Sequence, residues 1–140
     1  MTSVVFRALA AWLVLIVAES VHGTVRELWL KPYVGDLRAR QICVLTGMLI
    51  ILGVAYACIH WIRAETPRAL WLVGLLWVAL TLSFEFGLGL LVLGYSWERM
   101  LEDYDITRGG LLALGMVVLL LSPLIAAKLR QPRPVRATTV

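Results

Sequence analysis

The sequence predicts an all-α fold: an integral membrane bundle of four transmembrane helices, with a short interfacial helix between the third and the fourth. Composition is the first observation, because 61% of the 140 residues are hydrophobic and 16% are charged, whereas soluble domains carry about 25% charged residues. The second observation is three long apolar runs that each begin directly after an arginine. A membrane helix needs about 20 predominantly apolar residues, which these runs supply.

The first transmembrane helix is predicted at residues 4–25. The uncharged residues before Glu19 are too few to cross a bilayer by themselves. Residues 1–20 also match a cleaved signal peptide in their basic start, apolar middle and small residues near the end. We expect a retained helix because apolar character resumes at Val21 and Val25. N-terminal sequencing of the mature protein would decide between the two.

The next three transmembrane helices are predicted at residues 41–62, 69–94 and 109–127. The first and last of these contain no charged residue, and the middle one contains a single acid, Glu85. An acid in such a segment is usually buried in protein, paired or protonated, since a charged group at mid-membrane costs about 2.5–3.5 kcal/mol on insertion scales. Glu85 is therefore a functional candidate.

The connections differ in composition. Residues 27–40 mix apolar and charged side chains around a Lys-Pro and a Gly-Asp pair, which predicts an irregular segment on the membrane surface. Residues 63–68, which include Pro67, predict a tight turn. Residues 1–128 are then one membrane domain, and the basic, proline-containing residues 129–140 are predicted to be a disordered tail.

Between the third and fourth spans, apolar residues recur at i, i+3, i+4 and i+7, which predicts one face of a short helix. These residues are Trp97, Met100, Leu101 and Tyr104. The opposite face would carry Glu98, Glu102, Asp103 and Asp105. Such a helix can lie in the membrane interface or dock on a partner, so the four apolar residues are predicted partner or interface contacts.

Tryptophans mark the expected membrane surfaces, because indole rings favour the headgroup region. Trp29 and Trp97 are predicted at one surface, and Trp61 and Trp71 at the other. Trp12 and Trp77 fall in the middle of their helices, which indicates packing.

A polar cluster is predicted near the surface that holds the first and third connections. Glu19, His22 and Arg26 are spaced i, i+3 and i+7, so they share a helix face. Glu85 lies 17 residues beyond Arg68, about 25 Å along its helix and hence at a similar depth. Arg26 is the expected counter-charge for the acids. The alternative is that Glu19 and His22 merely reach interface water.

Metal and enzyme chemistry have little support in the sequence. Glu19 and His22 form an ExxH pair, which places two ligands on one helical turn, and Glu85 is a conceivable third ligand. Zinc-protease, phosphate-binding and nucleophile-elbow motifs are absent from the sequence. The question of an enzyme is left open, with the balance against it, and no cofactor is predicted.

A shift of 68 residues aligns several features of the two halves, such as Trp29 with Trp97 and Arg40 with Arg108. A duplicated pair of helices would have both copies running in the same direction. Such copies are related by a half-turn about the membrane normal.

Three functions are compatible with these patterns. The first is a non-catalytic accessory or interaction subunit that binds a membrane-protein partner or a second copy of itself. The second is a small proton-coupled transporter or channel-like homo-oligomer, and the third is a metal-dependent membrane enzyme. Compact, arginine-rich composition favours a bacterial inner membrane. The basic residues on the two sides number seven and six, too similar to decide the orientation, and the four cations of the C-terminal tail favour cytoplasmic termini. Nucleic acid is not an expected partner.

Overall fold

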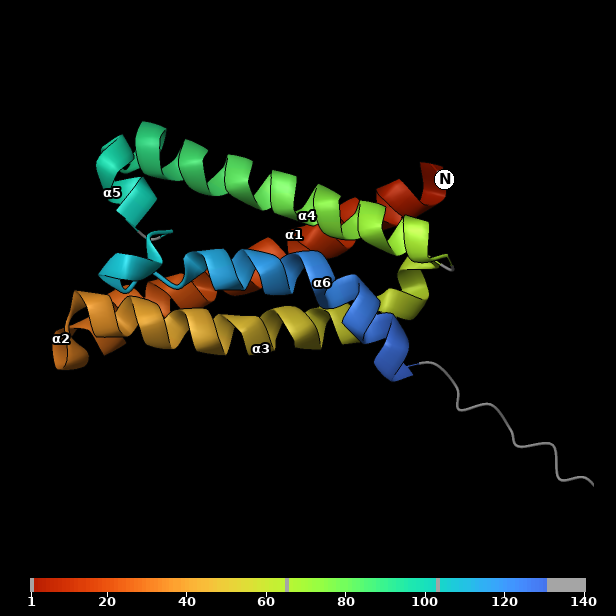
Figure 1. The fold of residues 1–140 in the computed structure, drawn as a ribbon, viewed down its shortest axis with the longest axis horizontal. Helices are drawn as coiled ribbons and strands as arrows, with labels where there is room; N and C mark the ends of the chain where they lie inside the picture. Colours follow the sequence, from red (N-terminus) through yellow and green to blue (C-terminus); the bar gives the residue numbers. More distant parts are fainter. Residues whose placement is uncertain (1, 65, 103, 131–140) are drawn as a thin grey trace, which may run out of the picture.

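The computed structural model describes residues 2–64, 66–102 and 104–130, and every regular element within these ranges is helical (Figure 1). Four helices are long and apolar enough to cross a membrane, and they comprise Ser3–Val34, Asp36–Ile62, Pro67–Val92 and Leu112–Arg130. A short helix, α5 (Trp97–Glu102), lies between the last two spans. The all-α bundle of four membrane helices predicted from the sequence is therefore confirmed.

The first span is longer than predicted. It continues past residue 25 through three elements, α1 (Thr2–Val25), the π-helical turn η1 (Arg26–Leu30) and α2 (Lys31–Val34). The chain then reverses at Gly35, whose φ of 87° suits a glycine, and α3 (Asp36–Ile62) follows at once. The prediction of an irregular segment at residues 27–40 was therefore wrong. Pro32 does not interrupt the helix because it lies in the first turn of α2, where its missing N–H is not needed.

The tight turn predicted at residues 63–68 is present. Arg63 ends α3 in the left-handed conformation, with φ 59°. Thr66 then caps α4 (Pro67–Gly87), because its hydroxyl accepts a 3.1 Å hydrogen bond from the Ala69 N–H. A second π-helical turn, η2 (Leu88–Val92), extends α4 to the opposite end of the bundle.

The chain returns through α5, the 3₁₀ turn η3 (Ile106–Arg108) and α6 (Leu112–Arg130). Asp105 caps η3 by accepting a 3.0 Å hydrogen bond from the Thr107 N–H. Leu129 and Arg130 belong to α6 rather than to the predicted tail. The rest of that tail, residues 131–140, and Asp103 of the predicted acidic face lie outside the described residues.

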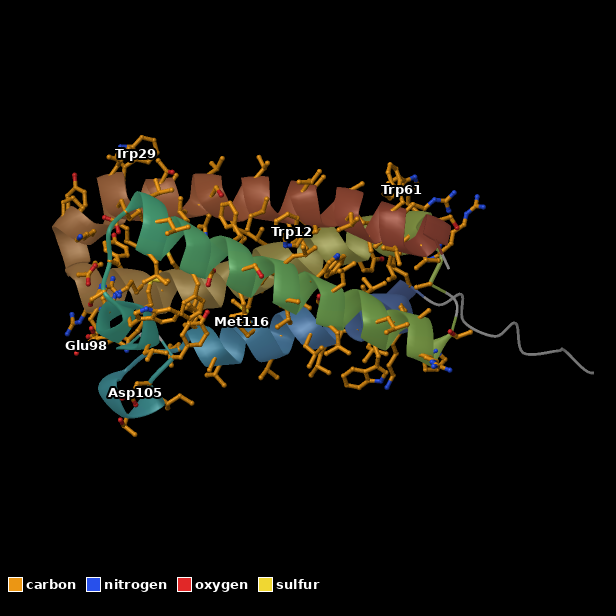
Figure 2. All side chains as sticks on the ribbon, turned by 90° about the horizontal axis from the view of Figure 1, so that it is seen from above. Trp12, Trp29, Trp61, Glu98, Asp105 and Met116 are labelled. Carbon is orange, nitrogen blue, oxygen red and sulfur yellow. The ribbon has the colours of Figure 1, made fainter. Side chains whose placement is uncertain are left out.

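The four spans pack as a ring. α1 contacts α3 and α4, and α6 contacts the same two helices on the opposite side (Figures 1 and 2). α1 and α4 run in the same direction, since each is followed by one returning span. A half-turn relating the two halves would place α1 diagonally across from α4. The two helices are neighbours, so the predicted repeat symmetry was wrong.

Two tryptophans join α1 to α4 inside the bundle. Trp77 is fully buried, and its indole Nε1 donates a 2.9 Å hydrogen bond to the Ala8 carbonyl. Trp12 donates through Nε1 to the Thr81 hydroxyl at 3.0 Å. Because the bilayer core offers no water to an indole N–H, both donors need such a protein acceptor. The packing role predicted for Trp12 and Trp77 is confirmed.

A proline lies inside α6, where it removes a backbone hydrogen bond. Pro123 has no N–H to offer the Leu119 carbonyl, four residues earlier. The Ser122 hydroxyl donates to that carbonyl at 2.7 Å, and Ser122 is itself fully buried. The side chain thus replaces the donor that Pro123 lacks, and the helix continues through this position.

The outside of the bundle is largely apolar. At most 28% of the most apolar window of any span is buried inside the bundle, so most aliphatic side chains of the spans face outward. Trp29 and Trp61 are exposed at opposite ends of the bundle, with Trp12 between them (Figure 2). An apolar belt with indoles at both rims is the surface that a lipid bilayer covers.

Candidate functional site

One end of the bundle, where α2 and α5 lie (Figure 1), contains the four residues of the predicted polar cluster. Glu19 and His22 are on the last turns of α1, Arg26 begins η1, and Glu85 is on the last turn of α4. Each of these helices approaches the same end, so the depths inferred from the sequence agree with the structure.

His22 links Glu19 to α3. Its Nδ1 lies 3.5 Å from Glu19 Oε2, and its Nε2 lies 2.7 Å from the Thr46 hydroxyl. That hydroxyl also lies 3.1 Å from the Ile42 carbonyl, to which it can donate its single hydrogen. His22 Nε2 is then the donor, and the Nδ1 side can share a proton with the Glu19 carboxylate. The pair can hold that proton on either group.

Glu19 lies against a glycine of α3. A methyl group built on Gly47 would stand 3.2 Å from Oε2 of Glu19, closer than most such contacts, and 3.5 Å from Oε1, an ordinary contact distance. Oε1 is buried and has no hydrogen-bond partner among the described residues. A carboxylate oxygen without a donor is costly to bury, so Oε1 is an unmet acceptor at the interface of α1 and α3.

The segment after α5 contacts Glu85 through Tyr104. The Tyr104 hydroxyl donates a 3.1 Å hydrogen bond to Glu85 Oε2. The Tyr104 ring stacks on Phe86 at 5.9 Å between centroids, and Phe86 also packs against Trp97 at 5.7 Å. These ring contacts fix the segment after α5 over the end of α4, and they place a hydroxyl next to the carboxylate.

Glu19 and Glu85 both lie near this end of the bundle, on the neighbouring helices α1 and α4. The packing of α1 on α4 explains this shared position. Trp12 contacts Thr81 and Phe84 of α4, and the two parallel helices advance together from there by 1.5 Å per residue. Glu19 thereby reaches the level of the last turn of α4, where Glu85 lies.

Arg26 does not contact the acids as the sequence suggested. Its ion pair is with the adjacent Glu27, from Nη2 to Oε1 at 3.4 Å. Glu27 also pairs with Lys31, from Oε2 to Nζ at 3.3 Å. Arg26 follows α1 directly and lines the same groove as His22. Arg26 faces the α1–α3 side of the molecule instead, near His22 and Cys43.

The predicted apolar face of α5 is divided between inside and outside. Met100 is buried against Gly89 of η2, and Tyr104 contacts Glu85 and Phe86. Trp97 and Leu101 remain 62% and 55% exposed. Half of this face therefore anchors α5 within the chain, and the other half is exposed.

The weak metal candidates do not make a metal site together. Within residues 2–64, 66–102 and 104–130, no three His, Cys, Asp or Glu side chains lie close enough to hold one ion. Glu19 and His22 lie near each other, but the Glu85 carboxylate bonds Tyr104 instead. A metal needs three or four convergent ligands, so this arrangement does not support metal chemistry.

Two contributors on α3, Thr46 and Gly47, were missed by the sequence reasoning. A hydroxyl next to a glycine within an apolar helix could have signalled a polar contact with close packing. Gln41 was also missed, although it ties the ends of α3 and α6 together by donating to the Gly109 carbonyl at 2.9 Å. No charge or motif distinguished these residues.

Comparison of the chain with protein-family models, with curated proteins and with solved structures found no match.

Proposed function

We propose that this small polytopic membrane protein exchanges protons at a carboxylate cluster near one membrane surface, as a small proton-coupled transporter or channel-like protein does. The observation that carries the proposal is the buried Oε1 of Glu19, which has no hydrogen-bond partner among the described residues, on a carboxylate whose other oxygen lies 3.5 Å from His22 Nδ1. Carboxylates within membrane spans are typical of proton relays, and Glu85 supplies a second one on the neighbouring span.

The neighbours of the two acids support a route for that proton. His22 connects Glu19 to Thr46 on the α1–α3 side, and Tyr104 connects Glu85 to the surface segment after α5. Imidazole and hydroxyl groups both donate and accept, which suits them to pass a proton. The cluster therefore has a protonatable group on each side of the two acids.

Proton flux into liposomes tests this proposal. The purified chain is reconstituted with an internal pH-sensitive dye, and a potassium diffusion potential drives proton entry. Glu19→Gln and Glu85→Gln should each abolish most of the flux while leaving the bundle assembled. Glu98→Gln, which removes an exposed acid from α5, is the matched control and should keep the flux. Flux that persists in both cluster variants rejects the proposal.

A second candidate function is a non-catalytic accessory subunit, which the exposed Trp97 and Leu101 favour. These side chains would contact a membrane-protein partner or a second copy of the chain at the membrane surface. A photo-crosslinking amino acid at position 101 should then give one discrete adduct, and Trp97→Ala should abolish that adduct. Labelling of lipid alone would contradict this candidate.

The proposed location is a bacterial inner membrane with both termini in the cytoplasm. The two ends of the described chain, at α1 and α6, lie at the same end of the bundle (Figure 1). A C-terminal fluorescent protein should therefore be bright, and a C-terminal alkaline phosphatase inactive. The reverse result would invert the orientation.

A further inference from the structure

A groove between α1 and α3 lies at the end of the bundle that also holds the carboxylate cluster. Its volume is ≈ 470 Å³, and it opens to the outside of the bundle. Its polar lining includes His22, Arg26 and Thr46, and its apolar lining includes Val25, Ile42 and Ile50. The guanidinium of Arg26 therefore lies at a groove whose lining contains no acidic residue.

Arg26 has donor capacity that the chain does not use. Its Nε is buried and has no hydrogen-bond partner among the described residues. Its bond to Glu27 is long, at 3.4 Å, and Glu27 is shared with Lys31. A guanidinium carries five N–H donors in a planar fork that fits a phosphate or carboxylate. A buried donor next to an open groove indicates an anionic ligand.

The helix geometry places this cation at the depth of lipid headgroups. Arg26 is the first residue of the π-helical turn η1, a form that recurs at functional sites. Trp29, in the same turn, is 67% exposed and lines the groove at its outer end. Indole rings settle at the headgroup level. α3 runs inward from Asp36, so Ile50 lies deeper in the bilayer than Ile42.

We propose that the groove between α1 and α3 binds one anionic phospholipid, with its phosphate on Arg26 and an acyl chain along Ile42 and Ile50. The charge of the groove selects an anionic over a zwitterionic lipid, because no lining acid is available to a choline cation. The apolar lower part of the groove requires a ligand with a hydrocarbon chain. The lipid site shares His22 and Thr46 with the proposed proton route, but the residues assigned to the lipid, Arg26, Ile42 and Ile50, are not part of that route.

Native mass spectrometry of the full chain in mild detergent tests the site. The probes are phosphatidylglycerol, phosphatidylcholine with the same acyl chains, and glycerol 3-phosphate, which lacks them. One phosphatidylglycerol should remain bound, about tenfold more tightly than phosphatidylcholine, because the choline cation offsets the phosphate charge that Arg26 attracts. Glycerol 3-phosphate should not bind. Equal retention of the two lipids, or equally tight binding of glycerol 3-phosphate, overturns the proposal.

Two variants examine the two parts of the groove. Arg26→Gln should weaken phosphatidylglycerol binding about tenfold, whereas Arg38→Gln, at an exposed arginine of the same end, should leave it unchanged. Ile50→Trp should block the acyl chain while keeping Arg26. Leu49→Trp is its control, since Leu49 is 70% exposed and does not line the groove. If Arg26→Gln does not fold, the Ile50→Trp comparison decides, and equal binding by both tryptophan variants overturns the proposal.

Discussion

The Glu19 carboxylate of α1 lies against Gly47 of α3, where a methyl group would stand only 3.2 Å from Oε2. This contact is possible because glycine leaves space for the carboxylate at the helix interface. It also holds one oxygen, Oε1, away from any described hydrogen-bond donor. The position of the acid therefore depends on the absence of a side chain on the facing helix.

Gly47→Ala should displace Glu19 and alter the cluster. The added methyl group must push the carboxylate by a few tenths of an ångström, and overpacking of this kind costs about 1–3 kcal/mol. We expect lower stability in SDS titrations of mixed micelles and reduced proton flux in liposomes. Gly53→Ala on the same helix meets nothing within 4 Å and should leave both properties near wild type. Equal behaviour of the two variants would contradict the proposed constraint.

Tyr104→Phe should weaken the attachment of the surface segment to α4. The substitution removes the hydroxyl that donates to Glu85 at 3.1 Å and keeps the ring that stacks on Phe86. Hydrogen bonds to charged groups contribute about 1.5–3 kcal/mol. Hydrogen exchange should show faster opening of residues 97–102. The liposome assay should show a lower proton flux. Tyr95→Phe is the control, because Tyr95 contributes its ring to Arg99 at 5.4 Å and should lose little. If Tyr104→Phe left hydrogen exchange and proton flux unchanged, Tyr104 would not be part of the proposed proton route.

The spans could be predicted from the sequence because each run of apolar residues directly reports the length that lipid requires. The depth of Glu19 and Glu85 followed as well, since it depends only on the 1.5 Å rise per residue. The sequence did not predict which helices pack against each other. Four apolar helices can form a ring in several orders, and the contacts that choose one order, such as Trp77 with Ala8, carry no distinctive sequence signal.

The prediction of an irregular connection at residues 27–40 failed for a different reason. Charged residues and Pro32 are typical of loops, but a helix at a membrane surface also tolerates them. The π-helical turn at Arg26 could not be predicted either, because no simple residue pattern indicates its hydrogen bonding. Arg26 pairs instead with Glu27, the next residue in the sequence, at 3.4 Å. The predicted pairing with the cluster acids did not consider this adjacent carboxylate.

Gly74→Ala should disrupt the contact between α4 and α6. A methyl group there would collide with the backbone carbonyl of Leu120, which cannot move aside as a flexible side chain can. We expect a loss of about 1–3 kcal/mol, or more if the helices separate. Thermal unfolding in detergent measures it. Gly87→Ala near the end of the same helix meets nothing within 4 Å and should be tolerated. A stable Gly74→Ala protein would mean that the two helices are farther apart.

Ser122 and Pro123 should show strong energetic coupling. Ser122→Ala removes the hydroxyl that donates to the Leu119 carbonyl at 2.7 Å and leaves this carbonyl buried without a donor. Such a loss costs about 1–3 kcal/mol. In a Pro123→Ala background the restored N–H of residue 123 can bond the Leu119 carbonyl, so the same serine substitution should cost far less. A double-mutant cycle from SDS titrations measures the difference directly. Additive effects would mean that Ser122 does not replace the donor missing from Pro123.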